Sequence, residues 1–360
     1  MLQALEICEV RIERVAFGGA GVGRLADGMV CFVPYSAPGE LVRVRVVSRK
    51  KNHSLGELVE VLEPAAGRVE PVCPAFGTCG GCQYQHLSYE VQLEIKRAQV
   101  EEALRRIAKI PAPAVEAVRP SPLAYAYRNR LSVHTRAGRT GFFARGTGRV
   151  VDVGRCAIAS EEVNGRLARY RASRPDDGER TLRAEAPFHG FRQVNDGAAE
   201  VLAGVVAELA GPGGGHLVDA YCGAGFFGLR LAGIFGEVTG IEWSAGAVRH
   251  ARENAPANAR FLEGPVEGLL AEVLRTRPPG ETCVLFDPPA EGLGPGVIDI
   301  VLAEGPLRVI YVSCDPSTLA RDAARLAAEY SLVRACPVDM FPQTAQIECA
   351  CLFEKSPTAQ

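Results

Sequence analysis

The sequence has no run of about 18 uninterrupted apolar residues, which excludes a transmembrane helix of ordinary length. Its first residues, MLQALEICEVRIER, alternate charged and apolar positions and lack the apolar core of a secretory signal peptide. It also lacks internal repeats and low-complexity tracts, and 47% apolar with 23% charged residues is typical of a folded chain. We therefore expect a cytoplasmic protein, and a length of 360 residues predicts two or three domains.

The chain has almost no net charge, but this neutrality is a cancellation between its two parts. Residues 1–190 carry 28 Lys and Arg against 21 Asp and Glu, whereas residues 191–360 carry 12 against 21, so +7 and −9 give −2. Between residues 96 and 149 there are 12 cations and 3 acids. This asymmetry indicates a nucleic-acid-facing part joined to a different domain, with a merely solvated arginine-rich surface as the alternative.

Residues 1–63 form the first predicted domain. Apolar and charged residues alternate there in short segments, and glycine-rich turns such as FGGAGVGR separate them. Several short strands within about 60 residues predict a small closed barrel. The stretch GGAGVGRLADGMVCFVPYSAPGELVRVRV resembles a TRAM domain, an OB-like RNA-binding barrel. A barrel that serves only in folding or docking is the alternative.

Residues 64–190 form a second predicted domain, of the small α+β kind. It opens with the cysteine-rich segment CPAFGTCGGCQYQHLSYE. A helix is expected from about residue 88 to residue 110, because Ser88 can cap it and an apolar stripe follows at helical spacing. Residues 120–190 are arginine-rich and strand-like.

Residues 191–360 change to alternating strands and helices, which predicts an α/β domain with a doubly wound parallel sheet. The last two of its seven strands are joined by a loop without a helix, which suits an antiparallel final strand beside the fifth. The expected strands are 216–219, 238–242, 260–263, 282–287, 308–313, 332–338 and 346–353. This layout resembles the class I (Rossmann-like) methyltransferases.

A nucleotide-type cofactor site is predicted at VDAYCGAGFFG, where Gly223, Gly225 and Gly228 follow the first of these strands. Glu242 ends the next strand, where a carboxylate can bind two ribose hydroxyls. The glycine pattern also fits a dinucleotide. However, Asp219 before the turn and Asp287-Pro288-Pro289 after the fourth strand favour S-adenosylmethionine, which carries no pyrophosphate.

Three reactive residues are predicted at the carboxyl edge of the sheet, where open α/β sheets bind ligands. Asp287 and Cys314 end the fourth and fifth strands, and Glu348 begins the antiparallel strand. A thiol paired with a carboxylate is what methylation of an unactivated pyrimidine carbon requires. The thiolate adds to C6 and activates C5, and a base later removes the C5 proton. Each residue taken singly is also compatible with a structural role.

The motifs YRNR, FRQVN, DAYCGAGFFGL, DPPAEGL, YVSCDPSTLARD and FPQTAQIE, in this order, resemble those of the tRNA/23S rRNA uracil-5-methyltransferases. The resemblance covers essentially the whole chain. It implies that Cys314 is the nucleophile and Glu348 the proton acceptor, and the residues it matches to S-adenosylmethionine contacts are Gln193, Tyr221, Glu242 and Asp287. Arg130 matches the YRN stretch. The chain departs from the family at Ala290, where Arg is usual, and at Phe226, where Asn is frequent.

A metal site is predicted at Cys73, Cys79, Cys82 and Cys156. Four thiolates also suit zinc, but structural zinc sites usually have two short Cys-x2–4-Cys pairs and only one is present. The glycines of CGGC expose N–H groups that can stabilise cluster sulfides. The segment resembles the [4Fe-4S] site of several of these methyltransferases, so the cluster is expected ahead of zinc or no metal. The other seven cysteines are expected to pack in cores.

We therefore expect a monomeric enzyme that methylates C5 of a uridine in structured RNA, either 23S rRNA or tRNA, after flipping the base. A cytosine-5 methyltransferase would need a second cysteine after the proline of the fourth-strand motif, which DPPA lacks. An amino-group methyltransferase would need an aromatic residue after the prolines, where Ala290 stands. A non-catalytic RNA-binding iron–sulfur protein is the third alternative.

Overall fold

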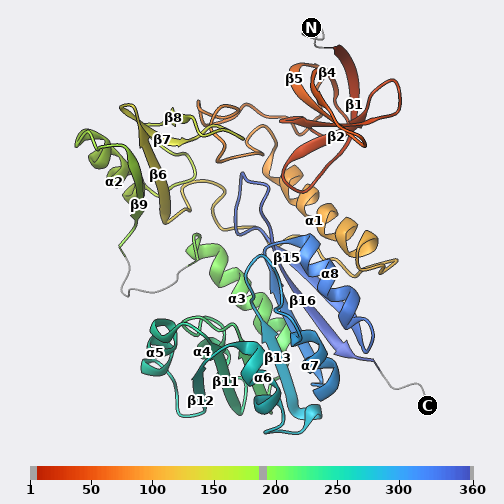
Figure 1. Cartoon of the computed structure of the whole chain (residues 1–360), viewed down its shortest axis with the longest axis vertical. Coiled ribbons are helices and arrows are strands. Elements are labelled where there is room, and N and C mark those ends of the chain that lie inside the picture. The colour runs from red at the N-terminus through yellow and green to blue at the C-terminus, as the bar shows by residue number, and fades with distance from the viewer. Residues whose placement is uncertain (1–5, 186–192, 357–360) are drawn as a thin grey trace. The chain divides into compact units, whose positions relative to one another are not determined.

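A computed structural model describes residues 6–185 and 193–356 of the chain (Figure 1). Contacts divide it into two compact units. The first comprises Met1–Gln99, Pro122–Glu185 and Phe341–Gln346, and the second comprises Val100–Ser121, Ala186–Met340 and Ile347–Gln360. Within the part of the chain that is described, no helix is long and apolar enough to cross a membrane.

The first unit begins with a closed five-stranded barrel, which confirms the barrel predicted from the glycine turns. Its strand order is β1-β2-β3-β5-β4, where β3 and β5 are parallel and the other pairs are antiparallel. Every second residue points inward, so that Val10, Ile12, Val33, Val42 and Val44 form a dry interior. The strands are β1 Ile7–Val15, β2 Ala20–Arg24, β3 Val30–Pro34, β4 Leu41–Arg49 and β5 Ser54–Glu63.

A four-stranded antiparallel sheet forms the other layer of the first unit, in the order β8-β7-β6-β9. One face packs against helix α2 (Glu161–Ala172), where Leu131, Val133 and Leu182 meet Val163 and Leu167. The opposite face carries mainly polar and charged side chains. The strands are β6 Arg130–Arg136, β7 Arg139–Phe143, β8 Val150–Asp152 and β9 Gly178–Arg183.

Helix α1 (Tyr89–Arg106) begins in the first unit and ends in the second. In the first unit its buried side chain Gln92 exchanges two hydrogen bonds with Gln343: Gln92 Nε2 donates to Gln343 Oε1, and Gln343 N donates to Gln92 Oε1, both at 3.0 Å. The Lys96 ammonium donates to the Phe341 carbonyl at 3.1 Å. These bonds fix the segment Phe341–Gln346, which runs directly ahead of the last strand.

The second unit contains a seven-stranded sheet in the order β12-β11-β10-β13-β14-β16-β15. Its first five strands in sequence are parallel, and β16 is antiparallel to both β14 and β15, as expected from the missing crossover helix. The strands are β10 His216–Ala220, β11 Glu237–Glu242, β12 Ala259–Glu263, β13 Thr282–Phe286, β14 Arg308–Ser313, β15 Tyr330–Val338 and β16 Glu348–Lys355. Their bounds lie within two residues of those predicted.

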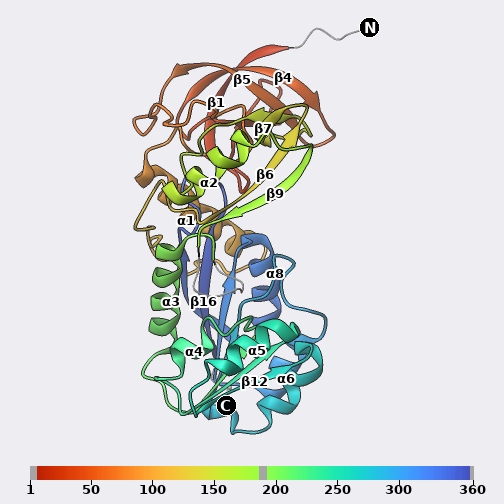
Figure 2. The ribbon, with the colours of Figure 1, turned by 90° about the vertical axis from the view of Figure 1, so that its left-hand side faces the viewer.

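Helices cover both faces of this sheet. Figure 2 shows α3 on one side of the strands and α6 and α8 on the other. The helices are α3 Asp196–Ala210, α4 Gly228–Leu231, α5 Ala245–Glu253, α6 Val266–Leu274, α7 Val297–Glu304 and α8 Pro316–Leu326, with a 3-10 turn at Pro279–Glu281.

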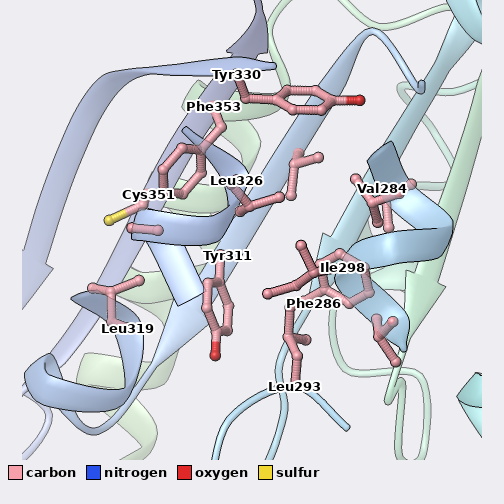
Figure 3. Packing of buried hydrophobic residues seen from close by; sticks show 14 of the residues in the cluster. Val284, Phe286, Leu293, Ile298, Tyr311, Leu319, Leu326, Tyr330, Cys351 and Phe353 are labelled. Atoms are coloured by element: carbon pink, nitrogen blue, oxygen red, sulfur yellow. The ribbon is translucent and has the colours of Figure 1, made fainter. Parts of the chain in front are cut away.

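The main core of the second unit lies between the central strands and helices α7 and α8 (Figure 3). Phe286 and Tyr311 project from β13 and β14 and are fully buried. Leu319 and Leu326 of α8 and Ile298 of α7 pack against this layer. Because these strands are fixed by a dry core, the residues at their carboxyl ends have fixed positions as well.

Candidate active site

The turn after β10 is a tight glycine turn that places the backbone close to Asp219. Asp219 Oδ2 accepts a hydrogen bond from the Gly228 N–H at 2.8 Å, at the start of α4. A Cβ at Gly228 would lie 2.9 Å from that same oxygen, so the close approach requires glycine. Gly225 adopts φ +84°, which also favours glycine, and Gly223 adopts φ +54°. The glycine turn predicted after the first strand of the sheet is therefore present, and its binding of a cofactor stays a prediction.

Glu242 ends β11 and joins this turn to the next one. Its Oε2 accepts a hydrogen bond from the Gly223 N–H at 3.1 Å, and its Oε1 accepts one from the Ser244 N–H at 2.8 Å. The side chain is 8% exposed. The structure thus joins Gly223 and Glu242, which the sequence predicted to share a site.

Buried carboxyl groups line the carboxyl edge of this sheet. Burial and the neighbouring Asp287 and Glu242 raise the pKa of Asp219 to about 8, and within the described residues its Oδ1 has no hydrogen-bond partner. Burial also raises the pKa of Asp287, at the end of β13, to about 7. Burial thus favours the neutral forms of both groups, and a cation bound beside them would favour the ionised forms.

The loop after Asp287 is held by helix α8. Thr318 Oγ1 donates to the Ala290 carbonyl at 2.9 Å, Arg321 donates to the Glu291 carbonyl at 2.9 Å, and Asp322 Oδ2 accepts from the Leu293 N–H at 3.1 Å. This role of α8 could not be predicted from the sequence, because side chains that bond to a distant loop leave no local pattern.

Tyr221 supports the same loop from the glycine turn. Its hydroxyl accepts a hydrogen bond from the Gly294 N–H at 3.2 Å and contacts Glu267 Oε1 at 3.4 Å. Its backbone has φ 64°, an uncommon conformation for a residue other than glycine. The hydroxyl of this predicted cofactor residue is therefore engaged within the protein, while its half-buried ring lies at the site.

Cys314 and Glu348 come together at the junction of β14 and β16. The antiparallel register pairs Ser313 with Cys349. Cys314 directly follows Ser313 at the end of β14, and Glu348 directly precedes Cys349 at the start of β16. The two residues, 34 positions apart in the sequence, thus lie at the same end of two paired strands.

The electrostatics of the pair agree with this proximity. Burial, Glu348 and Asp287 raise the pKa of the Cys314 thiol to about 11. Burial and Asp287 raise the pKa of Glu348 well above its ordinary value. All three residues predicted at this edge therefore interact with one another. Near neutral pH and without a ligand, the thiol is protonated.

Gln193 is half-buried and lies three residues ahead of α3, on a different element from the glycine turn. Next to it, Asn195 caps α3 by accepting from the Ala198 N–H and donates to the Met340 carbonyl at 3.1 Å. Phe191 and Arg192 of the FRQVN motif lie outside the described residues. The assignment of Gln193 to the cofactor therefore stays a prediction.

The two departures from the family motifs have structural consequences of their own. The Phe226 ring carries the Arg230 guanidinium at 4.1 Å from its centroid, and Arg230 in turn bonds Glu200 at 2.7 Å. Ala290 contributes only its carbonyl, to Thr318. The two departures leave the proposed nucleophile Cys314 and the proposed base Glu348 unchanged.

The four cysteines of the predicted metal site line one cavity of about 220 Å³ in the first unit. Cys73, Cys79 and Cys82 come from the turns after the barrel, and Cys156 lies between β8 and α2. Burial and the other three thiols raise the pKa of Cys82 to about 12. The structure thus brings together all four predicted ligands, from segments 74 residues apart.

Hydrogen-bond donors reach three of the four sulfur atoms and oppose the larger effect of burial, which raises the pKa values of all three thiols. Backbone N–H groups of Gly81 donate to Cys79, and those of Ile158 and Ala159 donate to Cys156. The Gln85 side chain bonds Cys82, and its Oε1 accepts from the Cys73 N–H at 3.0 Å. Such donors stabilise negative charge on sulfur.

Among the described residues, no group of three or more His, Cys, Asp or Glu side chains converges closely enough to hold a single metal ion. A tetrahedral zinc site, with Zn–S bonds of about 2.3 Å, would need the sulfur atoms within about 4 Å of one another. The metal or cluster expected at these cysteines therefore stays a prediction.

All twelve cysteines are free thiols. Six of the seven that were expected to pack in cores are buried: Cys31, Cys222, Cys283, Cys336, Cys349 and Cys351. Cys8 is only partly buried.

Two family models match the chain. The model of the TRAM domain matches residues 5–59, and the model described as tRNA (Uracil-5-)-methyltransferase matches residues 280–356. The second match covers the segment that contains Asp287, Cys314 and Glu348.

Curated relatives and a solved structure match nearly the whole chain. An RNA methyltransferase of Gloeobacter violaceus is 32% identical, with 96% of each chain covered. The tRNA (uracil(54)-C(5))-methyltransferase of Schizosaccharomyces pombe is 30% identical over 94% of this chain and 76% of its own. The crystal structure of the Pyrococcus abyssi tRNA (uracil-54, C5)-methyltransferase with S-adenosyl-L-homocysteine has a TM-score of 0.69 at 24% identity. It covers 96% of this chain and 100% of its own. This last likeness shows a shared fold.

Proposed function

The chain belongs to the S-adenosylmethionine-dependent RNA (uracil-5-)-methyltransferases that carry a TRAM domain, and on this premise we propose that it methylates C5 of a uridine in structured RNA. The observation that supports the proposal is the register of β14 and β16, which brings Cys314 and Glu348 to the same end of two paired strands, where Glu348 contributes to the raised pKa of the Cys314 thiol. A thiol and a carboxyl on opposite sides of one substrate position supply a nucleophile and a base for the same pyrimidine ring.

The cofactor site fits S-adenosylmethionine by charge and by shape. The cofactor carries a sulfonium and an ammonium, and their positive charge would favour the ionised forms of the buried Asp219 and Asp287. The Glu242 carboxylate at the end of β11 can accept hydrogen bonds from two ribose hydroxyls. Gly223 and Gly225 allow the backbone to approach the ligand, and Gln193 and Tyr221 complete the proposed contacts. When bound, the cofactor supplies an electrophilic methyl group.

The residues of the chain then divide the reaction between them. Cys314 loses its proton to water, and its Sγ forms a bond to C6 of uracil, which places the electron pair on C5 and O4. C5 forms the new bond to the methyl carbon as the sulfonium C–S bond breaks. Glu348 accepts the C5 proton, the C5 electron pair restores the C5–C6 double bond, and the Cys314 Sγ–C6 bond breaks. The net result is a methyl group in place of the C5 proton.

Binding of the positively charged cofactor has a second role, which is to lower the raised pKa of the Cys314 thiol. A thiol with a pKa of about 11 is a weak nucleophile near neutral pH, because its thiolate is scarce. A positive charge beside Asp287 would lower the pKa values of both Cys314 and Glu348. We therefore infer that the thiolate forms mainly in the cofactor-bound state.

The first unit is proposed to hold the RNA. Its four-stranded sheet carries a cluster of cations formed by Arg128, Arg130 and Arg183. Burial and the positive charges of Arg183 and Arg128 lower the pKa of Arg130, which indicates that the three side chains lie close together. On the same sheet, the His134 and Phe143 rings stack at 4.0 Å. Cations suit phosphates, and aromatic rings suit unstacked bases. The two similar proteins whose names state a substrate act on uracil-54 of tRNA, so unmodified tRNA is the first substrate to test.

The cavity lined by Cys73, Cys79, Cys82 and Cys156 is proposed to hold a [4Fe-4S] cluster, because the four cysteines line one cavity of about 220 Å³ and backbone N–H groups donate to the sulfurs of Cys79 and Cys156. Methyl transfer from a sulfonium needs no electron, so the four cysteines would cross-link the segment after the barrel to the four-stranded sheet. We also propose that the enzyme is a cytoplasmic monomer.

The test uses tritiated S-adenosylmethionine and tRNA that contains 5-fluorouridine. Fluorine at C5 cannot leave as a proton, so a covalent protein–RNA adduct that also carries tritium should accumulate on Cys314. If wild-type protein forms no such adduct with tRNA or with 23S rRNA fragments, or if Cys314→Ala forms it undiminished, the mechanism is wrong.

A further inference from the structure

Asp322 is a buried carboxylate in helix α8 that the proposed reaction does not use. It is only 1% exposed, and its Oδ2 accepts two hydrogen bonds, from the Tyr311 hydroxyl at 2.9 Å and from the Leu293 N–H at 3.1 Å. Its Oδ1 accepts from Arg321 Nε at 2.9 Å. A buried carboxylate costs free energy unless donors satisfy it, and these donors come from β14, from the loop after β13 and from α8 itself. Asp322 therefore joins segments that are far apart in the sequence.

Tyr311 links Asp322 to the reactive edge of the sheet. It lies on β14, three residues before Cys314. In the ladder between β13 and β14 it pairs with Phe286, which directly precedes Asp287. Burial and Asp322 raise the pKa of the Tyr311 hydroxyl well above its ordinary value, so the hydroxyl keeps its proton and donates a hydrogen bond. Asp322 thus fixes a side chain that lies beside the ends of both β13 and β14.

Leu293 is the second link, and it belongs to the loop that follows Asp287. Figure 3 shows Leu293 and the Tyr311 hydroxyl at the same end of the core. The loop comes closest to α8 at Gly292, which adopts φ +87°, and a Cβ there would lie 2.6 Å from Asp322 Oδ2. This approach requires glycine, so the loop packs directly against the carboxylate.

A single oxygen atom, Asp322 Oδ2, therefore bonds both the strand that ends before Cys314 and the loop that follows Asp287. Reacting groups must be held accurately, since a displacement of about 1 Å can cost about a hundredfold in rate. We propose that Asp322 is a positioning residue that holds the Cys314 strand and the Asp287 loop in the relative positions that methyl transfer needs. The proposal rests on the proposed function, because it assumes that Cys314 and Asp287 take part in the reaction. Asp322 acts through Tyr311 and Leu293 only.

Tyr311→Phe is the sharpest test, because it removes one hydroxyl and keeps the buried ring. With S-adenosylmethionine and tRNA that contains 5-fluorouridine, we expect its single-turnover rate constant for adduct formation to fall by about tenfold to a hundredfold. Asp322→Asn keeps the shape of the side chain, loses its charge and should slow this step at least as much. Both variants should bind S-adenosylhomocysteine with wild-type affinity in calorimetry, because Glu242 and the glycine turn are unchanged. A loss of folded protein alone would lower the binding stoichiometry and leave the rate constant unchanged.

The double variant with Asp322→Asn and Tyr311→Phe tests whether the two residues act through one bond. Its rate constant should fall by less than the product of the two single effects, because both substitutions disrupt the same contact. Asp299→Asn is the matched control. It removes the charge from a 69% exposed carboxylate that accepts from Arg325 of the same helix at 2.8 Å, and it should leave the rate constant unchanged.

Wild-type rate constants in Tyr311→Phe and Asp322→Asn would overturn the positioning proposal while the proposed function stands. Effects that multiply in the double variant would also overturn it, because the two residues would then act independently. A loss of cofactor affinity in step with the rate constant would show a general defect of the site and would overturn it too. If Asp322→Asn does not fold, Tyr311→Phe decides alone. If wild-type protein forms no adduct with tRNA or with 23S rRNA fragments, the positioning proposal and the proposed function both fall.

Discussion

Cys314 and Glu348 lie next to the last pair of the ladder between β14 and β16, in which Ser313 pairs with Cys349: Cys314 follows Ser313, and Glu348 precedes Cys349. A shift of one residue in this register would turn one of the two side chains to the other face of the sheet. The spacing of the proposed nucleophile and base is therefore set by the hydrogen-bond ladder between β14 and β16. That ladder lies over the apolar core of the second unit, which keeps it rigid.

Replacing the nucleophile should abolish the reaction and spare the cofactor site. We expect Cys314→Ala to lose methylation of tRNA to the level of the uncatalysed control and to bind S-adenosylhomocysteine with wild-type affinity in calorimetry. Cys283→Ala is the matched control, because Cys283 is buried in β13 away from the reacting edge. Methylation by purified Cys314→Ala above background would exclude Cys314 as the nucleophile.

Replacing the base should stop the reaction after methyl transfer. Glu348→Gln cannot accept the C5 proton, so an adduct between Cys314 and methylated, unfluorinated RNA should accumulate. Turnover should fall by about 10²–10⁴, the usual contribution of a general base. Denaturing gels with tritiated cofactor measure both quantities. Glu354→Gln on the same strand, which removes the charge from a part-buried contact with Arg308, is the control and should leave turnover unchanged. Fast turnover without adduct in Glu348→Gln would refute the assignment.

The reactivity of Cys314 should depend on pH and on the charge of the ligand. Because its pKa is raised to about 11, the thiolate fraction in the free protein should increase about tenfold per pH unit up to that value. Alkylation by iodoacetamide, followed by mass spectrometry of the Cys314 peptide, measures this rate. The cationic analogue sinefungin should move the midpoint to lower pH, whereas neutral S-adenosylhomocysteine should move it less. Equal shifts with both ligands would contradict the electrostatic explanation.

The buried carboxyl of Asp219 should make the free protein less stable at higher pH. Its pKa rises from 3.8 when unfolded to about 8 when folded, so folding takes up a proton between these values. The stabilising protonated form is fully present at low pH, and stability falls as pH rises through about 8. Asp219→Asn retains an acceptor for Gly228 and should remove part of this loss, on the order of a few kcal/mol.

Urea unfolding of the ligand-free protein at about pH 5 and about pH 9 tests this expectation. Wild-type protein should lose more stability between the two conditions than Asp219→Asn does. Glu253→Gln on the exposed face of α5 is the control and should behave like wild type. An identical pH dependence in Asp219→Asn and wild type would show that Asp219 ionises normally in the folded protein.

The cysteine cavity should yield a coloured protein when the chain is purified without oxygen. We expect a brown preparation with about four irons per chain, and Cys82→Ala should lose both iron and colour. Removal of iron by a chelator should lower the melting temperature, because Cys156 and the segment after the barrel would lose their cross-link. The buried Cys31→Ala is a control that should keep its iron. A colourless wild-type protein with stoichiometric zinc would show that the four cysteines bind zinc and not an iron–sulfur cluster.

Much of the second unit could be predicted from sequence because its signals are local. Apolar strands alternate with helices, glycines mark the turn after β10, and the missing helix before β16 leaves only an antiparallel pairing. These features depend on residues close together in the chain, such as Asp219 and Gly228. The barrel was predictable for the same reason, since its turns require the glycines that the sequence shows.

The hydrogen bonds that hold the loop after Asp287 could not be predicted, because they join segments that are far apart in the sequence. Asp322 bonds Leu293, and the Tyr221 hydroxyl bonds Gly294, yet neither side chain belongs to a recognisable local pattern. The raised pKa values of Asp219 and Asp287 arise from their burial in the folded protein, which cannot be predicted from the two residues taken singly.

The sequence by itself determined the types of residue available for chemistry: a thiol after one strand, a carboxyl at the start of another and four cysteines that could share a ligand. Only the tertiary structure decided that Cys314 meets Glu348, that the four cysteines line one cavity and that Asp322 bonds both Tyr311 and Leu293. The physical reason is that strand register and the burial of apolar faces act between segments far apart in the chain. Chemical function needs those segments at distances of a few ångströms.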